Sequence, residues 1–203
     1  MNSTEKKDRI EALQKIASDL EMSYVPKDEF GTIGLLRDFH LFQKGHSKSI
    51  VNLMQKSTGL MENKISIFDY IYKVGGGKAP PIKYMQTVFF IQSKSLALPE
   101  ILLKPETFFH KVGAFLGMQD IDFDIHPEFS DRYLLQGEEE NRIRQVMTDK
   151  VIRFFTVEKD WCMESIGFFL ILYRHNSVAM PDYIRLLHDK GMKLYHHLKS
   201  ETL

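Results

Sequence analysis

The stretch FDYIYKVGGGKAPPIKYMQTVFF occupies residues 68–90 and holds two segments rich in β-branched and aromatic residues. Three consecutive glycines and two prolines separate the segments. β-Branched and aromatic side chains favour strands, whereas glycine and proline favour turns. We therefore predict two antiparallel strands, over residues 64–74 and 84–92, which a glycine-rich loop joins into a hairpin.

Further predicted strands lie on both sides of this hairpin in the sequence. Residues 49–55 predict a strand before it, which gives three consecutive antiparallel strands. Residues 101–103 and 132–136 predict two short strands, and residues 160–173 predict two more about a turn near Gly167. Because residues 168–173 (FFLILY) are apolar without interruption, we expect their strand to be buried on both faces at the centre of the sheet.

Helical periodicity is strongest near the two ends of the chain. Residues 4–20 repeat apolar side chains at 3-4-3 spacing, and Pro181 begins a similar pattern over residues 181–200. Pro105 suits the first turn of a helix with five apolar core positions, and residues 138–155 predict a helix interrupted at residues 148–149. Those five positions are Phe108, Phe109, Val112, Phe115 and Leu116. A crossing loop with a little helix is expected over residues 27–45.

These elements predict an α+β fold, with a mostly antiparallel sheet of about six to eight strands covered by N- and C-terminal helices and one or two internal helices. We expect the helices to cover one face of the sheet. The chain reads as one domain over residues 1–203. It would contain an N-terminal helix and short strand (1–25), a sheet-rich core (46–175) and a C-terminal helix (181–200).

Composition narrows the classes of function. Lysine plus arginine and aspartate plus glutamate both number 27, so no overall field attracts nucleic acid. The single cysteine, Cys162, and a polar N-terminal stretch without a signal-peptide pattern indicate a cytoplasmic protein. No apolar run approaches the roughly 20 residues that span a bilayer, so we expect no transmembrane segment.

The glycine stretch does not match a phosphate-binding loop. Lys78 is followed by Ala79 and two prolines, and a strand rather than a helix comes next, so no helix N-terminus would face a phosphate. We favour a long hairpin loop, where glycine provides positive φ angles. A flap in which Lys78 and Lys83 close over an anionic ligand is the alternative.

The densest polar cluster is QDIDFDIHPEFSDRY, over residues 119–133. In an extended segment Asp120, Asp122, Asp124 and His126 point to one side, and such carboxylates are ligands for Mg²⁺ or Ca²⁺, with the imidazole favouring a transition metal. The alternative that we favour is a solvated edge strand without metal. In that strand Ile121, Phe123 and Ile125 would face the core.

Several motifs together resemble a widespread bacterial family of proteins of unknown function. They are GHSKSIVNLMQKS, IFDYIYKVGGGK, QTVFF, QDIDFDIHPEFSDRYLLQGEEE and FFLILYR, over roughly residues 42–175. Relatives in that family often carry membrane helices before this domain, so the resemblance implies work near a membrane surface. Its pattern also places a polar pair, Asp69 and Gln86, on neighbouring strands that the hairpin would bring close.

The sequence predicts a non-enzymatic module that binds a partner protein or a small ligand, without a cofactor. The predicted contact residues are Asp69, Gly75, Gly76, Gly77, Lys78 and Gln86. Two alternatives stay open: a metal-dependent hydrolase that uses the acidic cluster, and a carrier that holds an apolar small molecule between the sheet and the last helix. Pairing of two copies through an exposed strand edge would give a homodimer.

Overall fold

The computed structural model describes residues 3–29, 31–59, 62–107 and 120–199. Its helices are α1 (Ser3–Asp19), α2 (Thr32–Leu35), α3 (His40–Gln43), α4 (Pro127–Ser130), α5 (Glu140–Val146), α6 (Asp149–Val157) and α7 (Pro181–Leu198). Its strands are β1 (Ser23–Lys27), β2 (His46–Thr58), β3 (Asn63–Val74), β4 (Ile82–Ser93), β5 (Leu98–Pro105), β6 (Tyr133–Gln136), β7 (Cys162–Gly167) and β8 (Phe169–Tyr173).

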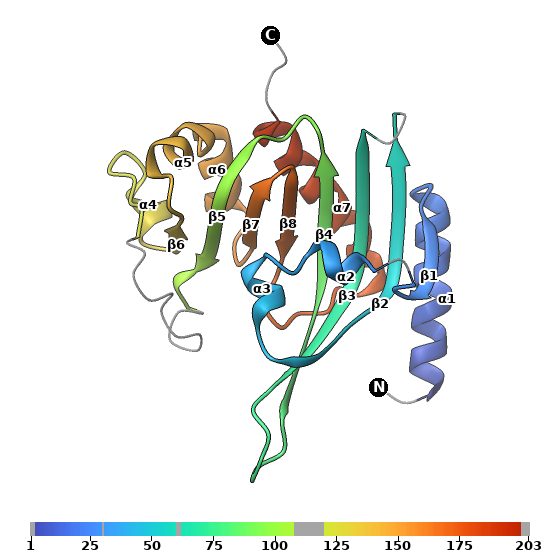
Figure 1. Ribbon diagram of the computed structural model, residues 1–203. Coiled ribbons are helices and arrows are strands. Elements are labelled where there is room, and N and C mark those ends of the chain that lie inside the picture. The colour runs from blue at the N-terminus through green and yellow to red at the C-terminus, as the bar shows by residue number, and fades with distance from the viewer. Residues whose placement is uncertain (1–2, 30, 60–61, 108–119, 200–203) are drawn as a thin grey trace.

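All these strands form one eight-stranded sheet with the order β1-β2-β3-β4-β8-β7-β5-β6, and every neighbouring pair is antiparallel. The predicted α+β fold with a mostly antiparallel sheet is therefore confirmed. The three consecutive strands β2, β3 and β4 lie side by side, as the sequence pattern indicates (Figure 1).

The β3–β4 hairpin pairs in continuous register from Asn63 opposite Ser93 to Val74 opposite Ile82. The loop over residues 75–81 is exposed, and its three glycines have φ angles of 79°, 123° and 86°. Residues other than glycine rarely adopt such backbone φ angles, which explains why three consecutive glycines occupy this loop. Figure 1 shows the hairpin extending well beyond the end of the other strands.

Strand β8 lies between β4 and β7 near the middle of the sheet, as its apolar sequence predicts. Alternate residues of β8 point to opposite faces, so Leu170 and Leu172 enter one core cluster and Ile171 and Tyr173 enter another. The sheet therefore has a hydrophobic core on each face.

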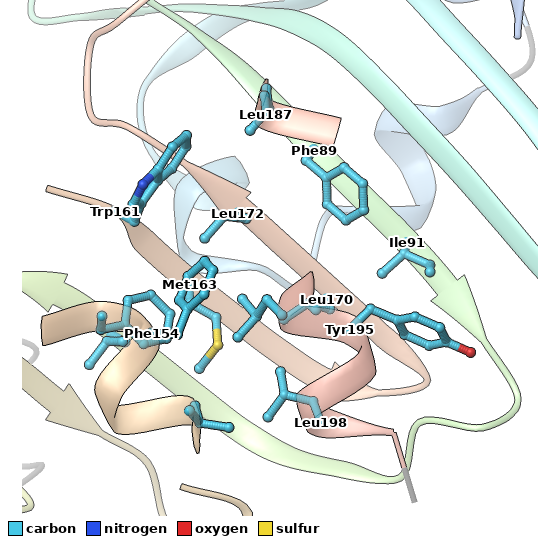
Figure 2. Packing of buried hydrophobic residues seen from close by; sticks show 14 of the residues in the cluster. Phe89, Ile91, Phe154, Trp161, Met163, Leu170, Leu172, Leu187, Tyr195 and Leu198 are labelled. Atoms are coloured by element: carbon cyan, nitrogen blue, oxygen red, sulfur yellow. The ribbon is translucent and has the colours of Figure 1, made fainter. Parts of the chain in front are cut away.

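The long helices cover the first of these faces. Helix α7 packs against β4 and β8, and α1 and α6 lie beside α7. Figure 2 shows side chains of this helix-covered core, with Trp161 and Leu187 at one border of the cluster and Tyr195 and Leu198 toward the other. Helix and sheet approach each other so closely that a Cβ atom at Gly191 would lie 2.5 Å from ring atoms of Phe89.

The second face is covered by the segment over residues 28–45, which includes α2 and α3 (Figure 1). Its buried Leu36, Phe39, Leu41 and Phe42 pack on the second-face residues of β2, β3, β4 and β8. A crossing loop with a little helix is confirmed here. The expectation that helices cover only one face is wrong, because the strands bury apolar side chains on both faces.

The environment of Pro105 adds detail to a second expectation. Pro105 itself ends β5, where it pairs with Tyr133 of β6, and residues 106–107 directly after it are 3₁₀-helical. Strand β7 pairs with β5 only up to Leu103, so Pro105 has a strand on one side alone. A proline without an N–H group is tolerated at such a position. The apolar residues predicted for the following helix, from Phe108 to Leu116, lie outside the described residues.

Near the C-terminus the predicted helices are confirmed. Residues 138–155 form two helices, α5 and α6, with a break at residues 147–148, close to the predicted interruption. Pro181 is the first residue of α7, and Ile184, Leu187, Leu194 and Leu198 are buried along one side of that helix. Among the described residues no helix is long and apolar enough to cross a membrane.

The close approach at Gly191 generates a stability prediction. Replacing Gly191 with alanine should lower the free energy of unfolding by about 1–3 kcal/mol, because the added methyl group forces the Phe89 ring out of its place. Chemical denaturation measures this loss. Gly34→Ala is the matched control, since a Cβ atom there meets nothing within 4 Å. An unchanged midpoint for Gly191→Ala would contradict the packing described here.

Candidate functional site

A buried ion pair ties α1 to the sheet. The guanidinium of Arg9 donates from Nη2 to Oδ2 of Asp69 at 2.9 Å, and the two residues are 8% and 1% exposed. The Asp69 carboxylate also accepts hydrogen bonds from Asn52 Nδ2 at 2.8 Å and Thr87 Oγ1 at 2.6 Å. Hydrogen bonds from three side chains compensate the loss of water around this charge.

The same network reaches the segment before α7. Arg9 Nη1 donates to the carbonyl oxygen of Ala179 at 2.8 Å, and the Ala179 N–H donates to Thr87 Oγ1 at 2.8 Å. Asn52 sits at a register shift in β2 with φ of 53°, and its Oδ1 accepts from the Tyr24 hydroxyl at 2.9 Å. The network thus joins α1, four strands and the segment that leads into α7.

Asp69 and Gln86 do not form the expected pair. In the hairpin register Asp69 lies opposite Thr87, and Gln86 lies opposite Tyr70. Because adjacent residues point to opposite faces of a strand, Asp69 lies on the helix-covered face and Gln86 on the other. The pair is wrong by one residue of register.

Gln86 is fully buried on the second face. Its Oε1 accepts from the backbone N–H of Asn176 at 3.2 Å, whereas its Nε2 has no hydrogen-bond partner among the described residues. The hydroxyl of Tyr70, its cross-strand neighbour, also lacks a partner there. These two polar groups therefore lie on the second face without a hydrogen-bond partner among the described residues.

The remaining predicted contact residues, Gly75, Gly76, Gly77 and Lys78, are exposed on the hairpin loop. A Cβ atom at any of these glycines would meet nothing within 4 Å, so the loop lies away from the body of the protein. Its base is held by a hydrogen bond of 2.9 Å between His46 Nε2 and the Gly75 carbonyl oxygen.

The acidic segment is irregular and is not an edge strand. Ile121 and Phe123 are buried as expected, but a turn at residues 124–125 breaks the alternation and leaves Ile125 80% exposed. The Asp120 carboxylate accepts from the Leu135 N–H at 2.8 Å, and partial burial of the carboxyl raises the pKa of Asp120. His126 Nε2 contacts Asp149 Oδ1 at 2.8 Å.

Asp120 and His126 therefore have separate partners. Where the structure describes the chain, no three His, Cys, Asp or Glu side chains are grouped so that they could hold a metal ion. Asp120, Asp122, Asp124 and His126 supply carboxylates and an imidazole along one segment, but the turn keeps them from facing one point. A metal-dependent hydrolase has no support from this geometry.

A second polar cluster was not predicted from the sequence. On the second face the buried Glu164 accepts hydrogen bonds from the Tyr173 hydroxyl at 2.7 Å and the Leu41 N–H at 3.2 Å. Burial and the neighbouring Lys104 lower the pKa of Lys44 to about 8. Burial also raises the pKa of the Cys162 thiol to about 12. The cluster connects residues far apart in sequence, which no local motif could indicate.

A pocket of about 220 Å³ lies at the N-terminal end of α7. Thr87 and Ala179, which belong to the polar network, form part of its wall, and Trp161 and Leu187 lie beside them. Three exposed apolar side chains, Met180, Tyr183 and Leu186, surround it. We name this the Trp161 pocket.

The polar groups of the Trp161 pocket are few. The indole Nε1–H of Trp161 is buried and has no hydrogen-bond acceptor among the described residues. The guanidinium of Arg174 lies over the indole ring at 4.5 Å and donates to the Lys159 carbonyl oxygen at 3.3 Å. A buried donor without an acceptor costs free energy, so this indole N–H is an unsatisfied group of the fold.

A solved structure of another protein resembles this fold. No protein-family model and no curated protein matches the chain. A crystal structure of the mycobacterial trehalose monomycolate transport factor A, TtfA, superposes with a TM-score of 0.62 over 93% of this chain and 90% of that chain. The sequence identity is 10%, so the likeness shows that the two proteins share a fold.

The buried ion pair generates a second stability prediction. Asp69→Asn should lower the free energy of unfolding by about 3–5 kcal/mol, because it leaves the Arg9 charge buried without a counter-charge. Urea denaturation followed by circular dichroism measures the change. Glu11→Gln in the exposed Lys7–Glu11 pair is the control, with an expected change below about 0.5 kcal/mol. Equal effects of the two substitutions would refute a special role for Asp69.

The raised pKa of Cys162 generates a prediction of reactivity. The thiolate is the reactive form, and both burial and protonation protect this thiol in the folded protein. An aromatic disulfide reagent at mildly alkaline pH should therefore react with Cys162 only after urea unfolds the chain. Rapid reaction of the native protein would show that the second face opens readily.

Proposed function

We propose that the protein is a non-catalytic binding module and that the Trp161 pocket receives the apolar end of a small amphipathic ligand. The observation that carries this proposal is the combination of a pocket lined largely by apolar side chains with the exposed guanidinium of Arg174 in its wall. Pockets that bind small molecules are mostly apolar and contain a few polar groups that orient the ligand.

The size of the pocket limits what enters it. Its volume of about 220 Å³ is below the range of about 300–1,000 Å³ that is usual for drug-sized ligands. The space between the sheet and the rest of α7 is filled, since Phe89 packs directly against Gly191. A chain of moderate length therefore enters with one end only, and the remainder lies across Met180, Tyr183 and Leu186.

The polar end of the ligand is an oxygen acceptor with negative or partial negative charge. Arg174 has no carboxylate partner in the part of the chain that the structure describes, and its guanidinium lies at the pocket wall. A carboxylate or ester oxygen would accept from the exposed guanidinium of Arg174. A medium-chain carboxylate has both an apolar chain that enters the pocket and an oxygen acceptor that reaches Arg174.

The structural likeness is consistent with a binding role. The mycobacterial protein that shares this fold is a transport factor for trehalose monomycolate, so its name describes transport rather than a reaction. That role belongs to the mycobacterial protein, and a shared fold alone does not carry a function from one protein to another. For this chain we propose a ligand with an acyl chain on the strength of the pocket itself.

The chain has a single tryptophan, which lines the pocket and reports directly on its occupant. Titration with the series from hexanoate to tetradecanoate, below micelle formation, should change Trp161 emission saturably. Leu186→Gln should weaken binding about tenfold, since burying a leucine side chain contributes about 1.5–3 kcal/mol when complete. Isothermal titration calorimetry measures the same dissociation constants without relying on fluorescence.

Matched variants separate pocket binding from general adsorption. Val157→Gln changes another apolar residue, which is 75% exposed but lies outside the pocket. The affinity of this variant for the carboxylates should equal that of the unmodified protein. Arg174→Gln should weaken binding of decanoate more than binding of decanol. No saturable response to any member of the series, or equal weakening by Leu186→Gln and Val157→Gln, would refute the proposed function.

A further inference from the structure

The tip of the β3–β4 hairpin exposes apolar side chains that the fold does not use. Val74 and Ile82 are cross-strand partners, 40% and 62% exposed. They continue a row of side chains on the second face that includes Tyr70, Tyr72 and Tyr84, whose rings stack at 5.4 Å and 5.2 Å. The row is covered near its middle and is open at the hairpin tip.

The charge of the outer part of this hairpin, beyond Asp69, is of one sign. Lys73, Lys78 and Lys83 lie on or beside the loop, and the sequence contains no aspartate or glutamate between Asp69 and Glu100. The chain as a whole has equal numbers of acidic and basic residues, so this local excess is a property of the hairpin. Lysine side chains favour anionic surfaces through charge rather than through a fixed geometry.

The loop between the strands is suited to contact with another surface. Its residues, from 75 to 81, are all exposed, and the space around each glycine is empty. Two consecutive prolines, Pro80 and Pro81, remove N–H groups from the loop, which reduces the cost of taking it out of water. The base of the loop is held by the His46–Gly75 hydrogen bond, and the paired strands carry the exposed loop at their end.

The hairpin starts from the end of the sheet where the Trp161 pocket lies. The Met85 N–H donates to Asn176 Oδ1 at 3.2 Å, and Tyr84 contacts the ring of His175, both in the segment that forms the pocket wall. Thr87 in the pocket wall and Ile82 at the tip are five residues apart on one strand. At about 3.3 Å per residue this separation is about 17 Å.

We propose that the hairpin tip docks on an anionic lipid surface. Val74 and Ile82 enter the interface between headgroups and acyl chains, and Lys73, Lys78 and Lys83 pair with anionic headgroups. A nucleic acid would instead favour exposed aromatic side chains for base stacking, and the tip exposes aliphatic ones. The proposal depends only on the hairpin, so it stands or fails independently of the pocket.

Vesicle flotation tests the proposal with the full chain. The probes are vesicles of phosphatidylcholine alone and of phosphatidylcholine with roughly a quarter phosphatidylserine. The protein should bind only the second kind. Lys78→Gln with Lys83→Gln should weaken binding about thirtyfold, because each lysine near an anionic leaflet contributes about 1 kcal/mol and about 1.4 kcal/mol is tenfold. Val74→Ser with Ile82→Ser should also weaken it.

The matched control removes the same charge from the other end of the same hairpin. Lys64→Gln with Lys94→Gln lowers the net charge equally but lies near the Asn63–Ser93 end, so it should leave vesicle binding unchanged. Circular dichroism confirms folding of each variant. Three results would overturn the proposal: no binding to phosphatidylserine vesicles, equal weakening by both lysine pairs, or tighter binding to duplex DNA than to vesicles.

Discussion

The buried pair of Arg9 and Asp69 is the interaction on which the arrangement of the layers depends. An isolated charge in this place would be strongly unfavourable, so each partner is stable only when the other is present with its full set of hydrogen bonds. Those bonds come from β2, β4 and the segment before α7. One carboxylate therefore sets the position of the first helix and of the wall of the Trp161 pocket together.

Two covered faces explain the composition of the sheet. Helices α1, α6 and α7 pack on one side, and the short segment with α2 and α3 packs on the other. A sheet with two cores needs strands whose successive residues are buried on both faces, as in the middle of β3 and β4 and in most of β8. Polar side chains inside such a sheet accept hydrogen bonds from backbone N–H groups outside the sheet. Glu164 accepts from Leu41, and Gln86 accepts from Asn176.

Much of the fold could be predicted from local pattern, whereas the candidate site could not. The glycines predicted the hairpin, the FFLILY run predicted the central place of β8, and Pro181 predicted the start of α7. The neighbour of Asp69 was wrong because register depends on which residues close the loop, and Val74 and Ile82 close it one step away from the position that would pair Gln86 with Asp69. Arg9 and Ala179 are 170 residues apart, and no sequence motif joins them.

The separation of Arg9 from its partners affects how the protein forms during synthesis. Helix α1 leaves the ribosome first, but Asp69 follows 60 residues later and Ala179 follows 170 residues later. At about 5–20 residues per second, the first helix waits roughly 10–30 s for its last partner. During that interval Leu13, Ile16 and Ala17, which the finished fold buries, lack the packing that α7 supplies. The final seating of α1 therefore depends on the last helix of the fold.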